Sequence, residues 1–270
     1  EMGKTKEIVK VKIDFNEPHI TYRLDDGSIV VGVTTAIGML NKPALPIWGF
    51  NQGRLSKFKS INEALEENKI NIGETEKDEL IKWAFNAGQQ RKYASLYGQV
   101  DKAANIGTIA HEILKARELG YEIDNSNITP DNWNSAKEAV KIYDKWFEVI
   151  TIKTIFIETP LVSNKYRYGG TIDKYAYLIK EKTLIDYKTG KDIYEEHFLQ
   201  LTGYSNLLIE NKYPLERAMI INMPKQKGDS FRVESRNVAE LFEAGYFEKF
   251  IHCIGVYNAD RKIKEFMKGE

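Results

Sequence analysis

The order of apolar and polar positions divides the chain into a largely helical first half and a strand-rich second half. Near the start, "EIVKVKIDF" and "HITYRLDDGSIVVGV" alternate apolar and polar residues, and Asp25-Asp26-Gly27 predicts the turn of a β-hairpin. Thr34 or Thr35 is expected to cap a short helix over "TAIGML". From about residue 60 to 120 the pattern is helical, with polar interruptions near 68–76.

The second half begins with one more helix and then changes character. Apolar residues recur at helical spacing from Ala136 to Ile150 and predict a core-facing helix over 134–150. Short β-branched and aromatic segments then predict strands over "TIFIETPLV", "GGTIDKYAYLI", "KTLIDYKTG", "RAMIINMPK" and "FRVESRNV". Helices are expected over "YEEHFLQLTGYSNLLIENK" and over the last 30 residues. This order predicts an α/β fold in which helices flank a sheet, with a helical N-terminal portion.

Composition places few limits on function. The chain has 270 residues, 42% of them hydrophobic and 29% charged, so it can bury the core of a soluble domain. Lys+Arg and Asp+Glu both number 39, so the net charge gives no sign of a nucleic-acid partner, although charges can still be segregated locally. The single cysteine, Cys253, excludes an intrachain disulfide and any cysteine-rich zinc or iron–sulfur centre. No apolar run approaches the roughly 20 residues that span a bilayer, and the first residues lack the apolar stretch of a signal peptide, so we expect no contact with a membrane.

Asp173, Asp186 and Lys188 form the candidate site. Asp186 follows Asp173 by thirteen residues with one polar turn between them, so the two segments are expected to pair as a hairpin. With Lys180-Glu181 at the centre of the turn, Asp173 lies opposite Lys188 on the face that Asp186 shares; with Glu181 alone at the centre, Asp173 points away. Two close carboxylates suit Mg²⁺ or Mn²⁺, and a nearby lysine can orient or deprotonate a water. The pattern therefore indicates metal-dependent phosphodiester hydrolysis, provided that the first register holds.

Several short motifs resemble a known family when they are taken together. "GGTID", "IDYKTG" and "QLTGY" follow one another, after "GTIAHEIL" and "FIETPL", and "VTTAIGMLNKPALPIWG" lies further upstream. In this order and spacing, over roughly 170 residues, they resemble the PD-(D/E)xK nuclease superfamily. The resemblance is to its RecB-like exonuclease branch, which includes phage exonucleases and the mitochondrial genome maintenance exonuclease. It implies a restriction-endonuclease-like mixed β-sheet flanked by helices.

The resemblance also implies a metal site. Asp173 and Asp186 would ligate Mg²⁺ or Mn²⁺, the backbone carbonyl of Tyr187 would be a further ligand, and His111 of "GTIAHEIL" would complete the site. Several relatives carry an iron–sulfur cluster as well, which the single cysteine excludes here.

Four further residues match catalytic positions of the family. Lys188 would serve the attacking water. Gln200 and Tyr204 match a Gln-xxx-Tyr helix motif that would contact substrate or support Lys188. Glu158 matches an acid that assists the metal site or the water in many relatives, although some relatives lack it.

Each of these residues has a structural interpretation as well. His111 lies on a helix stripe with Leu114 and the small Gly107, so it could be a packed core residue. Asp173 and Asp186 could be solvated strand charges, but aspartate is a poor strand former and two of them in facing strands favour a functional reason.

The remaining candidates divide in the same way. Glu158 precedes Pro160, so it could cap a strand or lie at its edge. Gln200, Tyr204 and His197 share a helical face and could form a polar stripe against the sheet. We favour a functional role for Gln200 and Tyr204 and a structural one for His197.

Basic and aromatic residues alternate in the N-terminal half. Arg54, Lys57, Lys59, Arg91 and Lys92 lie among tryptophans, phenylalanines and tyrosines. Such a mixture suits the stacking and phosphate contacts of single-stranded nucleic acid. At these helical spacings the aromatic residues could instead fill a core while the cations are solvated, so substrate binding by these five residues is the weaker interpretation.

These observations predict a metal-dependent DNA exonuclease acting on single strands or duplex ends, with a role in DNA repair or recombination. A structure-specific or restriction-like endonuclease, and a non-catalytic nucleic-acid-binding module on the same fold, stay open. We expect one nuclease domain over 1–270, with an N-terminal hairpin and helical substrate-channel portion over 1–100 and the catalytic core over 101–270. The expected location is the cytoplasm of a bacterium or of a phage-infected cell, and the sequence gives no indication of protein partners.

Overall fold

The computed structural model describes residues 10–15, 20–40, 94–224 and 230–269, with side chains of the helix that begins at Ala94 described from Asn105 onward. The chain divides into two compact units, Glu1–Leu40 with Asn105–Glu270 and Asn41–Ala104. Of the second unit the structure describes only the start of helix α4 (Ala94–Leu119). The expected helices between 60 and 93 lie outside the described residues, and the single-domain organisation stays a prediction.

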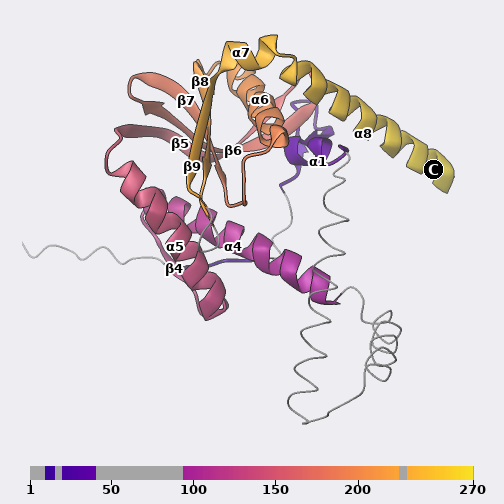
Figure 1. Ribbon diagram of the computed structural model, residues 1–270. Helices are drawn as coiled ribbons and strands as arrows, with labels where there is room; N and C mark the ends of the chain where they lie inside the picture. The colour runs from indigo at the N-terminus through magenta and orange to yellow at the C-terminus, as the bar shows by residue number, and fades with distance from the viewer. Residues whose placement is uncertain (1–9, 16–19, 41–93, 225–229, 270) are drawn as a thin grey trace, which may run out of the picture. The chain divides into compact units, whose positions relative to one another are not determined.

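A mixed sheet of seven described strands forms the centre of the first unit (Figure 1). Its order is β2-β3-β6-β7-β8-β9, with β5 paired to β6. The β3–β6 and β7–β8 pairs are parallel and the others antiparallel, so the predicted mixed sheet is confirmed. The strands are β2 (Tyr22–Arg23), β3 (Ile29–Gly32), β5 (Ile152–Ser163), β6 (Tyr168–Leu178), β7 (Glu181–Lys188), β8 (Arg217–Asn222) and β9 (Arg232–Asn237).

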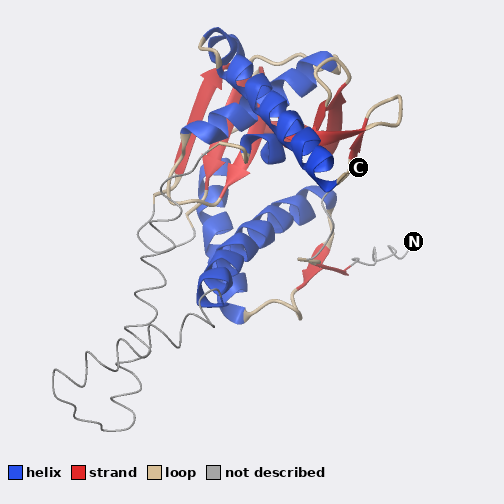
Figure 2. Cartoon of the chain, turned by 90° about the vertical axis from the view of Figure 1, so that its right-hand side faces the viewer, coloured by secondary structure: helices blue, strands red, loops and turns tan. Residues whose placement is uncertain are grey.

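Helices cover both faces of this sheet (Figures 1 and 2). One hydrophobic cluster joins the sheet to α1, α6, α7 and α8, and a second joins the opposite face to α4 and α5. The predicted class, an α/β fold with a mixed sheet flanked by helices, is therefore confirmed. Besides α4, the helices are α1 (Val33–Ile37), α5 (Pro130–Phe147), α6 (Glu195–Glu210), α7 (Val238–Glu243) and α8 (Tyr246–Lys268).

Local details agree with the sequence in some places and differ in others. The hairpin turn at Asp25-Asp26-Gly27 is confirmed: Gly27 has φ 80° and donates its N–H to the Leu24 carbonyl. The expected cap at Thr34 or Thr35 is wrong, because β3 runs directly into α1 and the extended Gly32 is the residue before the helix. A two-stranded sheet of β1 (Lys10–Lys12) and β4 (Glu122–Asp124) includes a strand that the pattern did not predict, since β4 has a single apolar residue.

The β6–β7 hairpin turns one residue earlier than expected. Leu178 pairs with Glu181, so the turn is Ile179-Lys180 rather than Lys180-Glu181. Both turn residues have positive φ, 49° and 85°, which a two-residue turn of this kind requires and which neither residue type favours. Glu181 belongs to the strand, where its carboxylate pairs with Arg217 of β8.

One edge of β6 is shared by two strands. β5 pairs along the full length of β6, so β3 and β7 must both lie on the opposite edge. There β3 pairs with Tyr168 and Gly169, and β7 pairs from Lys174 onward. The residues between, Gly170–Asp173, have no strand partner on this edge within the described part of the chain. We call this stretch of β6 the fork.

The alternation of side chains along β6 changes phase at the fork. Ile172 lies in the cluster beneath α6, as a strand with Tyr168 in that cluster requires. Beyond the fork it is Tyr175 that lies in this cluster, while Lys174 reaches Glu118 of α4 on the opposite face. Residues 172 and 174 therefore point to opposite faces, and Asp173 sits where the strand changes.

Candidate metal centre

His111 enters the site from helix α4. Its Nδ1 lies 3.7 Å from Oδ2 of Asp173, and its side chain is 30% exposed. The ring of Tyr187 packs edge-on against the imidazole at 5.9 Å, and the Tyr187 hydroxyl lies 3.3 Å from that of Tyr143 in α5. His111 is thus a half-buried residue held between a strand and a helix, with one ring nitrogen facing a carboxylate.

Asp173 occupies the end of the fork. Its Oδ2 accepts the backbone N–H of Tyr187 at 2.9 Å, where a further β6–β7 backbone bond would otherwise lie. Burial raises the pKa of Asp173, and the Lys188 ammonium and the Tyr187 N–H oppose this rise. The carboxylate is therefore anchored to the backbone of β7 and costly to keep charged.

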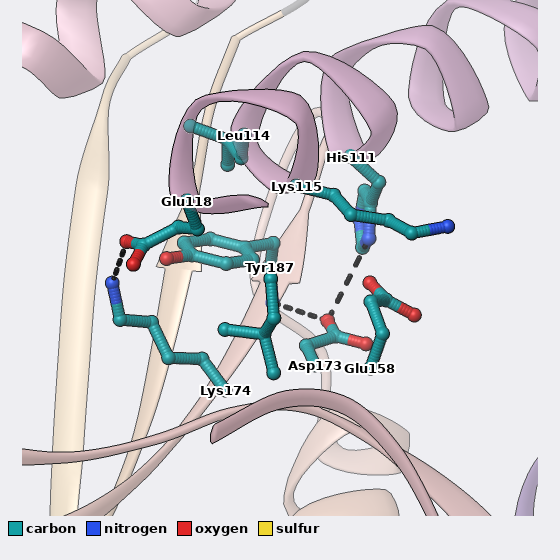
Figure 3. A pocket seen from close by; sticks show the side chains of 9 residues that line it. His111, Leu114, Lys115, Glu118, Glu158, Asp173, Lys174 and Tyr187 are labelled. Atoms are coloured by element: carbon teal, nitrogen blue, oxygen red, sulfur yellow. Dashed lines mark hydrogen bonds and ion pairs between the residues drawn. The ribbon is translucent and has the colours of Figure 1, made fainter. Parts of the chain in front are cut away.

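Glu158 completes a group of three possible ligands. It lies on β5 opposite Asp173 with φ 44°, a left-handed conformation rare in strands. Burial, and then the charge of Asp173, raise the pKa of Glu158 to about 7. Donor atoms of His111, Glu158 and Asp173 all lie within 4.8 Å of one another, and the three side chains line one pocket (Figure 3).

Asp186 and Lys188 form a buried ion pair on β7. Lys188 Nζ lies 2.5 Å from Asp186 Oδ2, with the side chains 19% and 1% exposed. Burial raises the pKa of Asp186 to about 6; Lys188 opposes the rise and Asp173 adds to it. Among the described residues, neither Asp186 oxygen accepts a hydrogen bond of regular geometry, and this carboxylate forms an ion pair with Lys188 alone. Asp186 is outside the group of three ligands but near enough to interact with Asp173.

The expected arrangement on one face of the hairpin is wrong in its simple form. The true register still places Asp173 opposite Asp186, because moving the turn preserved the parity. However, Leu184 packs beneath α6, so by alternation Asp186 and Lys188 lie on that face. Asp173 instead turns toward His111 of α4, because β6 changes phase there. The two halves of the site approach the fork from opposite faces.

Gln200 and Tyr204 lie on the α6 side of the fork. Gln200 Nε2 donates to the Tyr204 hydroxyl at 2.9 Å. The Tyr204 ring covers Gly170, where an added Cβ would lie 2.5 Å from ring atom Cε1. Burial first, and then the charges of Asp186 and Asp173, raise the pKa of Tyr204. The Gln-xxx-Tyr motif is therefore adjacent to both carboxylates.

His197 has a structural contact that agrees with the interpretation favoured from the sequence. Its Nδ1 accepts the backbone N–H of Tyr194 at 3.2 Å, and its own backbone N–H donates to the Tyr194 carbonyl at 3.0 Å, so His197 closes the first turn of α6.

The backbone carbonyl of Tyr187 is directed by the strand. Within a strand the N–H and C=O of one residue point to the same side. Since the Tyr187 N–H reaches Asp173 and the Lys188 carbonyl accepts from Met223, the residue after β8, the Tyr187 carbonyl faces the fork. It is available as an oxygen donor beside Asp173.

The donor set fits a divalent cation. Three carboxylates with raised pKa values gather near one imidazole, and an ion there would offset the cost of burying their charge. Carboxylate and carbonyl oxygens suit Mg²⁺ and Mn²⁺, and an imidazole nitrogen is better tolerated by Mn²⁺ than by Mg²⁺.

Two features of the site were missed in the sequence. Lys115 follows His111 by one helical turn, lines the same pocket and opposes the raised pKa of Glu158; the i, i+4 spacing could have indicated it. Lys174 is 1% exposed and pairs with Glu118 of α4, so it fixes the helix that carries His111 to β6. Because Glu118 is 29% exposed, loss of Lys174 leaves a partly solvated carboxylate, whereas loss of Glu118 leaves a buried ammonium and costs about 3 kcal/mol or more.

Arg54, Lys57, Lys59, Arg91 and Lys92 lie outside the described residues, and substrate binding by them stays a prediction. No helix in the described part of the chain is long and apolar enough to cross a bilayer.

Fold and site together define a mixed α/β protein with a histidine–carboxylate centre suited to a divalent cation. No family model and no curated protein matches the chain. Among solved structures it is similar to a proposed exonuclease from Eubacterium rectale, at 12% identity and a TM-score of 0.34, over 49% of this chain and 59% of that one. It is also similar to SSO0001, at 14% identity and a TM-score of 0.28, over 55% and 72% of the two chains.

The chain thus spans less than two thirds of the first of these structures. Similarities at these TM-scores do not decide the function, so the family remains a resemblance.

Proposed function

We propose that this protein is a metal-dependent nuclease that hydrolyses phosphodiester bonds of DNA. One observation carries the proposal: donor atoms of His111, Glu158 and Asp173 meet within 4.8 Å, and the Asp186–Lys188 pair lies on the adjacent strand. His111, Glu158 and Asp173 would hold Mg²⁺ or Mn²⁺, with Asp186 and the Tyr187 carbonyl beside them. Such an ion neutralises phosphate charge and makes water a stronger nucleophile at neutral pH.

The side chains around this centre divide the remaining work. The Lys188 ammonium, still 19% exposed, orients the attacking water and offsets the negative charge that develops on the phosphate. Gln200 and Tyr204 donate neutral hydrogen bonds toward the substrate or hold Lys188 in place. Lys115 adds a positive charge at the rim of the pocket, where a phosphate would approach.

The decisive experiment compares two acids on one strand. Asp186→Ala is expected to lower the rate of cleavage of end-labelled DNA by about a thousandfold or more. It removes a carboxylate beside the proposed metal ligands, and that carboxylate is also the ion-pair partner of Lys188. DNA binding, followed by fluorescence anisotropy, is expected to stay within about threefold. The matched control is Glu181→Gln, which removes an exposed charge at the other end of β7 and should cleave normally. Full activity of a folded Asp186→Ala protein would refute the proposal.

A chelator is expected to stop cleavage, and Mg²⁺ or Mn²⁺ to restore it. Cleavage that persists in excess chelator would refute a metal mechanism. Absence of cleavage on DNA and RNA with either ion would favour a binding module instead.

The finer proposal is exonuclease action on single strands or duplex ends. A 5′-labelled linear strand should be degraded while a closed circular strand survives. Loss of the circle would assign the same site to an endonuclease.

A further inference from the structure

Two hydroxyl groups lie at the fork on the face where His111 contacts Asp173. The Tyr22 hydroxyl of β2 and Thr171 Oγ1 of β6 are 3.0 Å apart. The Tyr22 ring rests on Gly169, where an added Cβ would lie 2.3 Å from ring atom Cγ. Glycine at this position therefore lets a tyrosine from the N-terminal hairpin lie flat on the strand that carries Asp173.

The position of this pair relative to Asp173 follows from the strand. Gly169, Thr171 and Asp173 are alternate residues before the change of phase, so they face the same way. Thr171 precedes Asp173 by two residues, about 7 Å along a strand. Tyr204 lies near both regions: burial, then the charges of Asp186 and Asp173, and to a smaller extent Tyr22 raise the pKa of its hydroxyl. The hydroxyl pair thus lies two residues along β6 from the candidate metal ligand Asp173.

The pair retains hydrogen-bonding capacity. Two hydroxyls carry two hydrogens, and the bond between them uses one. Within the described part of the chain the other hydrogen has no acceptor and can donate, and Tyr22 is half-buried rather than enclosed. Uncharged hydroxyls of threonine and tyrosine are common donors to the phosphate oxygens of nucleic acids.

We propose that the Tyr22–Thr171 hydroxyl pair binds the phosphate adjacent to the one that is cleaved, and so sets the register of the strand in the site. This inference rests on the proposed nuclease function and extends it from the reacting phosphate to its neighbour. The spacing of about 7 Å along β6 is comparable to the step between phosphates in an extended single strand.

The test separates binding from folding. Tyr22→Phe keeps the ring on Gly169 and removes only the hydroxyl; Thr171→Val does the same for its partner. Each is expected to raise KM about three- to tenfold, the effect of one neutral hydrogen bond, with kcat and melting temperature unchanged. Tyr177→Phe, near the turn end of the same strand, is the matched control and should behave as the unaltered protein.

A chemically altered substrate identifies the contact. A single uncharged methylphosphonate linkage is moved along an oligonucleotide, one position at a time. With the methylphosphonate at one position beside the cleaved bond, the KM of the unaltered protein should rise by the same factor as the Tyr22→Phe substitution gives. The KM of Tyr22→Phe itself should not rise further with that substrate.

Three outcomes would overturn the proposal. Tyr22→Phe with an unaltered KM would exclude the contact, and a shared fall in melting temperature and kcat would make the hydroxyls structural only. Equal sensitivity of both proteins to every methylphosphonate position would exclude the adjacent phosphate. Each of these leaves the nuclease itself intact, whereas an unaltered protein that cleaves nothing in Mg²⁺ or Mn²⁺ would overturn both proposals.

Discussion

The two ends of the β6–β7 hairpin are held in different ways. At the closed end the chain turns through Ile179-Lys180, with Ile179 70% exposed and the nearby Glu181–Arg217 pair near the surface. At the open end the strands part at Asp173, and Asp186 is 1% exposed with only Lys188 paired to it among the described residues. The closed end contains a slightly strained backbone turn, and the open end contains buried charged groups.

The two ends of the hairpin have different roles, one structural and one functional. The closed end sets the register and can change without altering any functional group. The open end carries carboxylates whose charge is disfavoured by burial, which lowers the stability of the metal-free protein. The candidate site is therefore expected to respond to metal and pH, and the turn to neither.

The largest expected effect is at the open end. Asp173→Asn keeps an acceptor for the Tyr187 N–H but removes the charge between His111 and Glu158. Cleavage should fall by about a thousandfold or more, and the rise in melting temperature that Mn²⁺ gives the unaltered protein should vanish. Cleavage kinetics measure the loss of activity, and differential scanning fluorimetry measures the change in melting temperature with Mn²⁺. Lys180→Ala at the closed end is the control; equal losses in both variants would erase the distinction between the ends.

A smaller effect concerns pH in the presence of a chelator. The pKa values of Asp186 and Glu158 are raised to about 6 and about 7 in the folded chain. The folded state therefore binds protons at these two groups more tightly than the unfolded state does. These two groups should therefore make the protein more stable at pH 5 than at pH 8, by on the order of 2 kcal/mol. Urea titrations at each pH measure this slope.

The pH slope has its own control. A variant with both Asp186→Asn and Glu158→Gln should show a much flatter dependence over the same range. A slope that persists unchanged would place the titrating groups elsewhere in the molecule.

The smallest expected effect is at the closed end. Replacing Ile179-Lys180 by Asn-Gly supplies residues that favour positive φ at both turn positions. The free energy of unfolding should rise by about 1 kcal/mol, with cleavage unaltered. Lower stability of the variant would show that the turn is not the strained element.

The sequence was informative where structure is local. The period of α5 and the strands around Asp173 and Asp186 followed from nearby residues, as did the choice of His111, whose helix precedes them in the chain. The start of α5 was predicted four residues late, because Pro130 and its cap Thr129 were not taken into account.

The fork could not be predicted in this way. It depends on β3 joining β6 in parallel, a pairing of Val31 with Tyr168 from distant parts of the chain. The left-handed Glu158 and the approach of Tyr22 to Gly169 follow from that packing, since no local pattern requires either. The two-sided geometry of the site is thus a tertiary property.

The change of phase in β6 has a consequence for how substitutions will be tolerated. Before Asp173 the even-numbered positions Tyr168 and Ile172 pack beneath α6; after it the odd-numbered Tyr175 does so. In a saturation library across this strand, the positions that do not tolerate polar substitutions should therefore change from even to odd numbers at Asp173. Inherited variation would carry the same signature, and a deletion of one residue on either side would exchange the faces of half a strand.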